Sequence, residues 1–205
     1  VRNEALYRAP EDNKPPPVAI RALLIATCTG VSFFHGSNDG QKGMGLIMLI
    51  LIGAAPTAYA LNRATPDSAT PAFVETAQRA SGIFASHAGG APRPESAAAA
   101  RSVVGDALKV REVNRPEVYA ALAVLTQDIG RQVQGYGAVR LVPAAATPNV
   151  RNDMYLASDA VRVMGAHPAG FGDEEVAALK SMRGLLDEGT RFIPTWVKVT
   201  VALAL

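Results

Sequence analysis

Six polar or ionisable side chains stand close together in an apolar part of the chain. Residues 31–45 read VSFFHGSNDGQKGMG, and the six side chains lie within residues 35–42: His35, Ser37, Asn38, Asp39, Gln41 and Lys42. Amide and hydroxyl groups donate hydrogen bonds to oxyanions or coordinate cations through oxygen, and an ammonium group attracts anions. A carboxylate in apolar surroundings has to be paired, protonated or bound to a cation. These residue types therefore suit a site that handles an anion together with a cation.

The chain on both sides of this motif is apolar and carries no charge over residues 22–34 and 43–62. Two such runs with ionisable residues between them are typical of a membrane segment that is broken around a substrate or ion pathway. The first run, residues 18–34, is shorter than the roughly 20 residues that a spanning helix needs. We therefore predict membrane segments over residues 18–63, arranged as two passes or as a re-entrant hairpin, with both ends on the same side.

Glycines at positions 36, 40, 43 and 45 run through the motif. Glycine weakens a helix, and a broken helix is tolerated at membrane depth where protein or a polar cavity satisfies its backbone groups. We expect the break at this motif. A helix that restarts near Gln41 would point free N–H groups at an anion, as the half-helices of transporters do.

Composition narrows the class of protein. The chain has 205 residues and a net charge of only +2, with scattered basic residues, which argues against a nucleic-acid partner. The single cysteine, Cys28, excludes a disulfide framework and is interpreted as a packing residue. Because the chain begins without methionine and its last residues, VKVTVALAL, lie in an apolar run, we expect it to be an internal fragment of a longer polypeptide.

The overall organisation predicted from these patterns is all-α. Residues 1–17 form a polar loop, residues 64–190 a soluble, water-exposed helical insert, and residues 191–205 the start of a truncated transmembrane helix. Within the insert, apolar periodicity and helix-start signals predict helices over residues 72–88, 95–113, 116–133, 153–165 and 173–188. The prolines at 92–94 and 143–148 mark loops.

Other chemistries fit the sequence less well. The glycine-rich motif does not follow the P-loop pattern, and Asp39 is alone where a calcium loop needs several spaced carboxylates. His87 and His167 have no metal-ligand spacing and are expected at the surface, so we predict no metal site. Asp39 and Lys42 are also spaced for a structural ion pair, and His35 for bracing the backbone instead of transferring a proton.

The run from Phe33 to Gly43, FFHGSNDGQKG, resembles the second signature of the PiT family of inorganic phosphate transporters, which reads roughly Phe-x-His-Gly-x-Asn-Asp. The neighbouring residues 27–32 (TCTGVS) and 44–48 (MGLIM) resemble the bacterial low-affinity branch, as does PTWVKV at 194–199. The resemblance covers about residues 14–63, and the helical insert carries none of it.

This resemblance implies a secondary transporter of two inverted halves, each giving one Asn-Asp motif to a shared phosphate site, with the present chain from the C-terminal half. Ser37, Asn38, Asp39 and Gln41 are then the expected phosphate-binding residues. Asp39, with His35 and Lys42, is expected to couple the ion. Family members use protons or sodium, and many sodium-coupled members have asparagine in place of Lys42. The lysine thus favours proton coupling, as in bacterial members that carry metal–phosphate complexes.

The implied protein is a multi-pass protein of the bacterial inner membrane. Its expected partners are inorganic phosphate, the lipid bilayer and the remaining helices of the transporter, and a homodimer is left open. No cofactor is expected besides the co-transported proton or sodium and a divalent metal bound to phosphate. A second interpretation is a membrane scaffold or regulatory protein whose helical insert binds a soluble partner. An enzyme is not expected, because the sequence offers no nucleophile–base pair.

Overall fold

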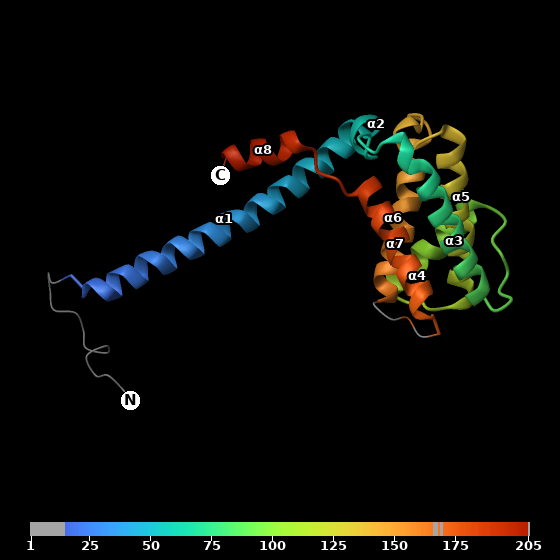
Figure 1. The fold of residues 1–205 in the computed structure, drawn as a ribbon, viewed down its shortest axis with the longest axis horizontal. Coiled ribbons are helices and arrows are strands. Elements are labelled where there is room, and N and C mark those ends of the chain that lie inside the picture. The colour runs from blue at the N-terminus through green and yellow to red at the C-terminus, as the bar shows by residue number, and fades with distance from the viewer. Residues whose placement is uncertain (1–14, 166–167, 169, 205) are drawn as a thin grey trace. The chain divides into compact units, whose positions relative to one another are not determined.

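All regular elements in the described part of the chain are helical, which confirms the all-α fold (Figure 1). The computed structural model describes residues 15–165, 168 and 170–204, so that most of the predicted polar loop, residues 1–14, lies outside them. The α-helices are α1 (Val18–Ala54), α2 (Pro56–Tyr59), α3 (Thr70–His87), α4 (Ala97–Val110), α5 (Pro116–Tyr136), α6 (Thr147–Met164), α7 (Asp173–Thr190) and α8 (Thr195–Ala204). Short 3-10 turns are η2 (Asp67–Ala69) and η3 (Val139–Leu141).

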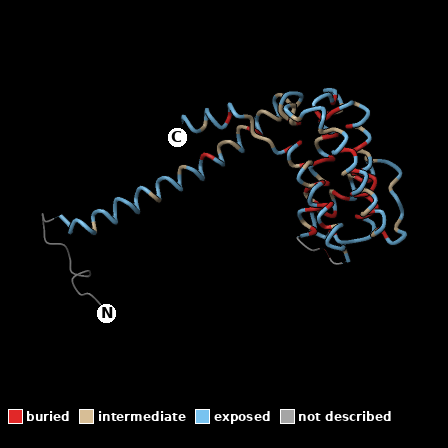
Figure 2. Tube along the Cα trace, in the orientation of Figure 1, coloured by how far each residue is buried: buried red, intermediate tan, exposed pale blue. Residues whose placement is uncertain are grey.

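The chain divides into two compact units. Residues 1–47 and 195–205 form one unit, and residues 48–194 form the other, which we call the helical domain. Figure 2 shows that buried residues concentrate in the helices of the helical domain, whereas α1 is almost entirely exposed up to residue 47. Helix α8 covers ten residues of the apolar C-terminal segment.

Helix α1 is continuous over 37 residues and passes through the polar motif without interruption. The predicted break at the glycines is therefore not present in this structure. At a rise of about 1.5 Å per residue, α1 is roughly 55 Å long, well above the roughly 30 Å of a hydrocarbon layer. A continuous helix satisfies its backbone groups internally, which outweighs the roughly 1 kcal/mol that each glycine costs.

The interruption lies instead at Pro56. Helix α1 ends at Ala54, and Ala55 leaves the helical region with φ −139° and ψ 65° before Pro56 opens α2. Steric contact with the proline ring disfavours the α conformation for the preceding residue. Of the described helices, α1 is the one whose length and composition suit crossing a membrane, with a mean hydropathy of 1.6. The predicted second apolar run thus belongs largely to the same helix.

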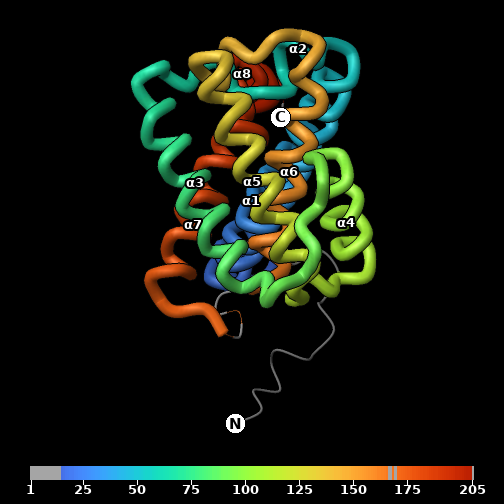
Figure 3. The backbone as a smooth tube through the Cα atoms, turned by 90° about the vertical axis from the view of Figure 1, so that its right-hand side faces the viewer, coloured from blue at the N-terminus to red at the C-terminus, as the bar shows by residue number. Residues whose placement is uncertain are grey.

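The helical domain is a bundle in which α5 contacts α3, α4 and α6 (Figure 3), and α7 completes it against α3 and α6. Helices α3 to α7 confirm the five predicted helices, although α6 begins at Thr147, six residues before the predicted start. The predicted loop around 143–148 ends in Pro148, which lies in the first turn of this helix. The N–H groups of the first turn have no partner within the helix, so proline, which lacks an N–H, is tolerated there. Prolines 71 and 116 likewise lie in the first turns of α3 and α5.

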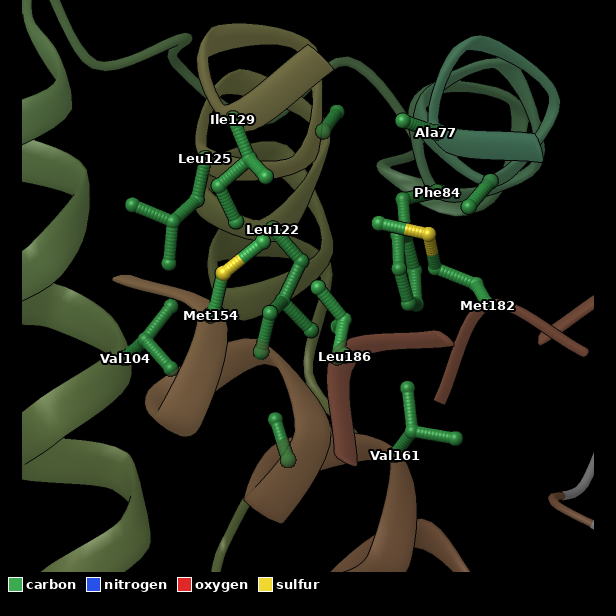
Figure 4. Packing of buried hydrophobic residues seen from close by; sticks show 14 of the residues in the cluster. Ala77, Phe84, Val104, Leu122, Leu125, Ile129, Met154, Val161, Met182 and Leu186 are labelled. Carbon is green, nitrogen blue, oxygen red and sulfur yellow. The ribbon is translucent and has the colours of Figure 1, made fainter. Parts of the chain in front are cut away.

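The core of the helical domain is made of aliphatic, methionine and phenylalanine side chains from all five helices (Figure 4). Phe84 on α3 is fully buried, as are Leu122 on α5, Met154 on α6 and Leu186 on α7. Helices α3 and α5 approach closely where a Cβ on Gly130 would lie 3.1 Å from the Ala77 Cβ. Such a core gives the insert the means to fold as a unit.

A buried ion pair joins α4 to α6. Arg101 donates from Nε to Asp153 Oδ1 (2.5 Å) and from its terminal nitrogen to Asp153 Oδ2 (2.9 Å). The Asp153 side chain is 0% exposed, whereas that of Arg101 is 27% exposed. Burial raises the pKa of the Asp153 carboxyl, and the hydrogen bonds from Arg101 oppose that rise. The pair is therefore a polar link inside an otherwise apolar interface.

His87 lies at the other end of α3 and is partly buried, which corrects the surface position predicted for it; His167 lies outside the described residues. The His87 ring stacks on Phe171 at 3.9 Å, and its Nε2 lies 3.0 Å from Glu175 Oε2. Glu175 also accepts from the Gly172 N–H at 2.9 Å, which caps α7. The hydrogen bond from Gly172, followed by that from His87, lowers the pKa of Glu175 below 4.5.

Glu175→Gln is expected to lower the melting temperature of the helical domain near neutral pH, and its difference from wild type is expected to shrink as the pH falls below 4.5. Because the folded-state pKa of Glu175 is lowered, its stabilising contribution is present above the unfolded value of 4.5 and is lost as the pH falls through the folded value. Circular dichroism of the chain in detergent measures the effect. Glu174→Gln changes the same charge in the same helical turn and is the control; equal pH dependence in both variants would contradict the prediction.

Candidate functional site

The polar motif lies on α1 with its side chains exposed. Asp39 is 48% exposed, and the neighbouring Phe33 and Phe34 are exposed as well. An apolar surface of this kind has to be covered by lipid or by other protein, because large exposed apolar patches mark interaction sites. The motif thus offers charged groups within a surface that water would not normally contact.

Asp39 contacts two neighbouring side chains on its own helix. His35 Nε2 lies 3.2 Å from Asp39 Oδ2, and Lys42 Nζ lies 3.5 Å from Asp39 Oδ1. The spacings i,i+4 and i,i+3 place all three side chains on one face of the helix. His35 therefore points at a carboxylate, and the ion pair between Asp39 and Lys42 that the sequence allowed is present.

The continuous helix divides the predicted site between two faces. At about 100° per residue, Asn38 lies about 40° from Lys42, 60° from His35 and 100° from Asp39, so that these four residues share an arc of about 100° that forms one polar face. Ser37 and Gln41 lie roughly 160° from Asp39, on the other side of the helix. The structure thus brings the ion-coupling candidates together, with Asn38 beside Lys42. Ser37 and Gln41 lie away from Asp39, although Gln41 is about 60° from Asn38.

The polar face can hold an anion and a proton, whereas metal ligands are scarce. Lys42 and Asn38 supply donors that suit an oxyanion, and Asp39 and His35 are groups that can carry a proton. Within residues 15–165, 168 and 170–204, no three His, Cys, Asp or Glu side chains gather into a group that could hold a metal ion.

Comparison with known proteins identifies the family. The model of the "Phosphate transporter family" matches residues 2–205, which is nearly the whole chain. The chain belongs to the phosphate transporter family. This confirms the resemblance inferred from residues 33–43, and it makes the chain part of a family of membrane transporters rather than of enzymes.

Several known proteins that are similar to the chain agree with this family. The chain is 29% identical over 207 residues to "Low-affinity inorganic phosphate transporter PitA" of Escherichia coli K12, covering 95% of this chain and 39% of the relative. It is 27% identical to PitB of the same organism, covering 100% of this chain and 42% of that relative. A Buchnera aphidicola low-affinity inorganic phosphate transporter is 53% identical over 58 residues, 28% of this chain and 12% of the relative.

The chain therefore spans about two fifths of the length of the Escherichia coli relatives that it matches. No solved structure matches it. The ion pair between Arg101 and Asp153 was not predicted from the sequence, and neither was the contact between Glu175 and His87. The one local signal was an arginine inside the alanine-rich run of residues 97–104, where an unpaired charge would be costly.

Proposed function

We propose that the chain is part of a secondary symporter that moves inorganic phosphate, free or as a metal–phosphate complex, across a bacterial inner membrane together with protons. Its membrane part would be multi-pass and would include helices beyond α1. Family membership over residues 2–205 and the names of the relatives support this proposal. The observation that carries it is the polar face of His35, Asn38, Asp39 and Lys42 on a helix apolar enough to span a membrane.

Phosphate binding would use the donors of the polar face. The Lys42 ammonium and the Asn38 amide lie about 40° apart around the helix, so both can reach the oxygens of one phosphate. A charge-assisted hydrogen bond from Lys42 would contribute about 1.5–3 kcal/mol. Ser37 and Gln41 stay predictions for phosphate binding, because they lie about 140° and 100° from Lys42 around a regular helix.

Proton coupling would follow from the charge of Asp39. Two unit negative charges 4 Å apart repel by about 4 kcal/mol at an effective dielectric constant of roughly 20. An ionised Asp39 would thus oppose phosphate beside it. A proton bound to Asp39, or held by His35 against it, removes that repulsion. Because the coupling is reciprocal, phosphate in turn favours protonation, which is the thermodynamic requirement of symport.

The test of this function is labelled-phosphate uptake by the full-length protein in cells that lack their own phosphate transporters. We expect uptake that is lost on adding a protonophore and is unchanged when choline replaces sodium. Uptake that requires sodium would overturn the proton assignment and leave phosphate transport standing. No uptake at matched membrane expression would overturn the transport function in favour of a scaffold whose helical domain binds a soluble partner.

Lys42→Asn is expected to raise the phosphate concentration for half-maximal uptake about tenfold or more, since a charged donor worth about 1.5–3 kcal/mol is lost. We also expect the variant to be stimulated by sodium, because a cation can then fill the position of the ammonium group. Lys42→Arg keeps the charge and is the control, with uptake still independent of sodium. An unchanged phosphate dependence in Lys42→Asn would exclude a contact between Lys42 and phosphate.

A further inference from the structure

One end of the helical domain gathers both connections to the apolar helices. The Asn62 N–H donates to the Gly189 carbonyl at 2.8 Å, and Asn62 Nδ2 donates to the Glu188 carbonyl at 3.1 Å. Asn62 follows α1 and α2, and Gly189 precedes α8, so these bonds tie the two connections to each other. If α1 lies in a bilayer, as proposed above, chain connectivity keeps this end of the helical domain at the membrane surface.

The same end carries an uncharged, largely exposed segment, residues 141–148 (LVPAAATP), which we call the apolar tip. Leu141 is 48% exposed, and Pro143, Ala144 and Ala145 are exposed beside it. In Figure 3 the connection between α5 and α6, which contains the apolar tip, arches over the end of the bundle where α2 lies.

Arg63 holds the apolar tip in place. Its guanidinium group donates to the carbonyls of Arg140 and Val142 (3.1 Å for the latter) and to Thr147 Oγ1 (3.4 Å). Its Nε donates to the Thr57 carbonyl at 3.1 Å, on α2. One side chain thus fixes the tip to the segment that follows α1.

The backbone and the flanks of the apolar tip suit a lipid boundary. The N–H groups of Ala146 and Thr147 both donate to the Pro143 carbonyl at 3.0 Å, so these two donors are satisfied within the turn. Backbone groups have to be satisfied internally where water is scarce. Arg140 precedes the tip and donates to both carboxylate oxygens of Asp67, which balances its charge. Arg151 follows the tip, with its guanidinium carbon 6.0 Å from the centroid of the Tyr155 ring.

We propose that the apolar tip, residues 141–148, inserts at the boundary between headgroups and acyl chains of the bilayer that holds α1. The helical domain is then docked on the membrane surface at two points, the tether at Asn62 and the tip. The inference rests on the proposed membrane position of α1, but not on phosphate as the substrate. The occupant is lipid, because the tether brings lipid to this face whichever proteins are present.

The experiment places an environment-sensitive fluorophore on a single cysteine of the full-length protein in vesicles of phosphatidylcholine and phosphatidylglycerol. Quenching by nitroxide-labelled lipids is compared between Ala144→Cys in the apolar tip and Ala177→Cys, both in a background with Cys28→Ser and any cysteine outside this chain replaced. Ala177 is an exposed alanine of α7 about 18 Å along the helix from Gly189. A third protein keeps the native Cys28 on α1 as its single labelled cysteine. Because Cys28 is exposed, its quenching shows whether α1 is inserted in the bilayer.

We expect several-fold stronger quenching at position 144 than at position 177, and loss of that difference when Leu141→Glu is added. Leu141 is half exposed, so this charge disturbs the tip without disturbing the core. Equal, weak quenching at 144 and 177 while Cys28 is quenched would overturn the inference alone. Shielding of position 144 from water without lipid quenching would assign the tip to a protein partner and also overturn it. An unquenched Cys28 would overturn both the inference and the membrane position of α1.

Discussion

Asp39→Asn is expected to abolish proton-coupled phosphate uptake while the protein remains folded and in the membrane. Asparagine has nearly the same size as aspartate and keeps a hydrogen-bonding oxygen, but it cannot take up a proton or pair with Lys42. The contacts that would be lost are those to His35 at 3.2 Å and to Lys42 at 3.5 Å. If Asp39 couples proton and phosphate, its loss removes a coupling free energy. At its upper range, this free energy corresponds to a change of about 100-fold in the affinity for phosphate.

The measurement is initial-rate uptake of labelled phosphate at matched membrane expression of wild type and variant. Asp106→Asn is the control, because Asp106 pairs with Lys109 at the same i,i+3 spacing on an exposed face of α4. Its uptake should equal that of wild type. Equal uptake by wild type and Asp39→Asn would leave phosphate transport standing and would remove Asp39 from the transport path.

Arg101→Met is expected to destabilise the helical domain by about 3–5 kcal/mol near neutral pH, since removing one partner of a buried ion pair leaves an uncompensated charge. The charge that remains is the fully buried Asp153 carboxylate. The pKa of Asp153 is already raised by burial, so the folded state retains its proton to a higher pH than the unfolded chain. Stability from this group is present below the unfolded pKa and is lost as the pH rises through the folded value.

The loss of folding stability caused by Arg101→Met should therefore grow from acid to neutral pH. Amide hydrogen exchange of α4 and α6, measured on the chain in detergent, gives this loss of stability. The pH dependence due to other acidic groups is the same in wild type and variant, so it cancels when the two are compared. The double variant Arg101→Met with Asp153→Leu should recover most of the stability, because a well-packed apolar pair often replaces a buried ion pair without loss. A deficit that is constant with pH would show that Asp153 is not the group left unpaired.

Local patterns account for the helices of the insert. Apolar spacing predicts α3, a proline in the first turn predicts the start of α5, and three acids predict the start of α7. These signals act within one or two turns, so they are visible in the sequence. The start of α6 was predicted too late because the prolines around 143–148 were interpreted only as breakers, although Pro148 stands where a helix tolerates it.

Where α1 ends depends on small differences in free energy, which a sequence pattern does not give. Four glycines suggested a break, yet each costs only about 1 kcal/mol in a helix, whereas the clash before Pro56 forces Ala55 out of the helical region. The continuity of α1 then decided which motif residues share a face. In the continuous helix, His35 and Lys42 lie next to Asp39, whereas Ser37 and Gln41 lie on the opposite side of the helix from Asp39.

By itself, the sequence determined the all-helical class, the phosphate transporter family and the position of the polar motif. Each of these features depends on residues that are close together in the sequence. Only the tertiary structure decided which distant residues meet. Arg101 and Asp153 are 52 positions apart, and Asn62 and Glu188 are 126 apart. Such pairs are set by how helices pack around a shared core, and a periodic pattern shows which face of a helix is buried but not what it is buried against.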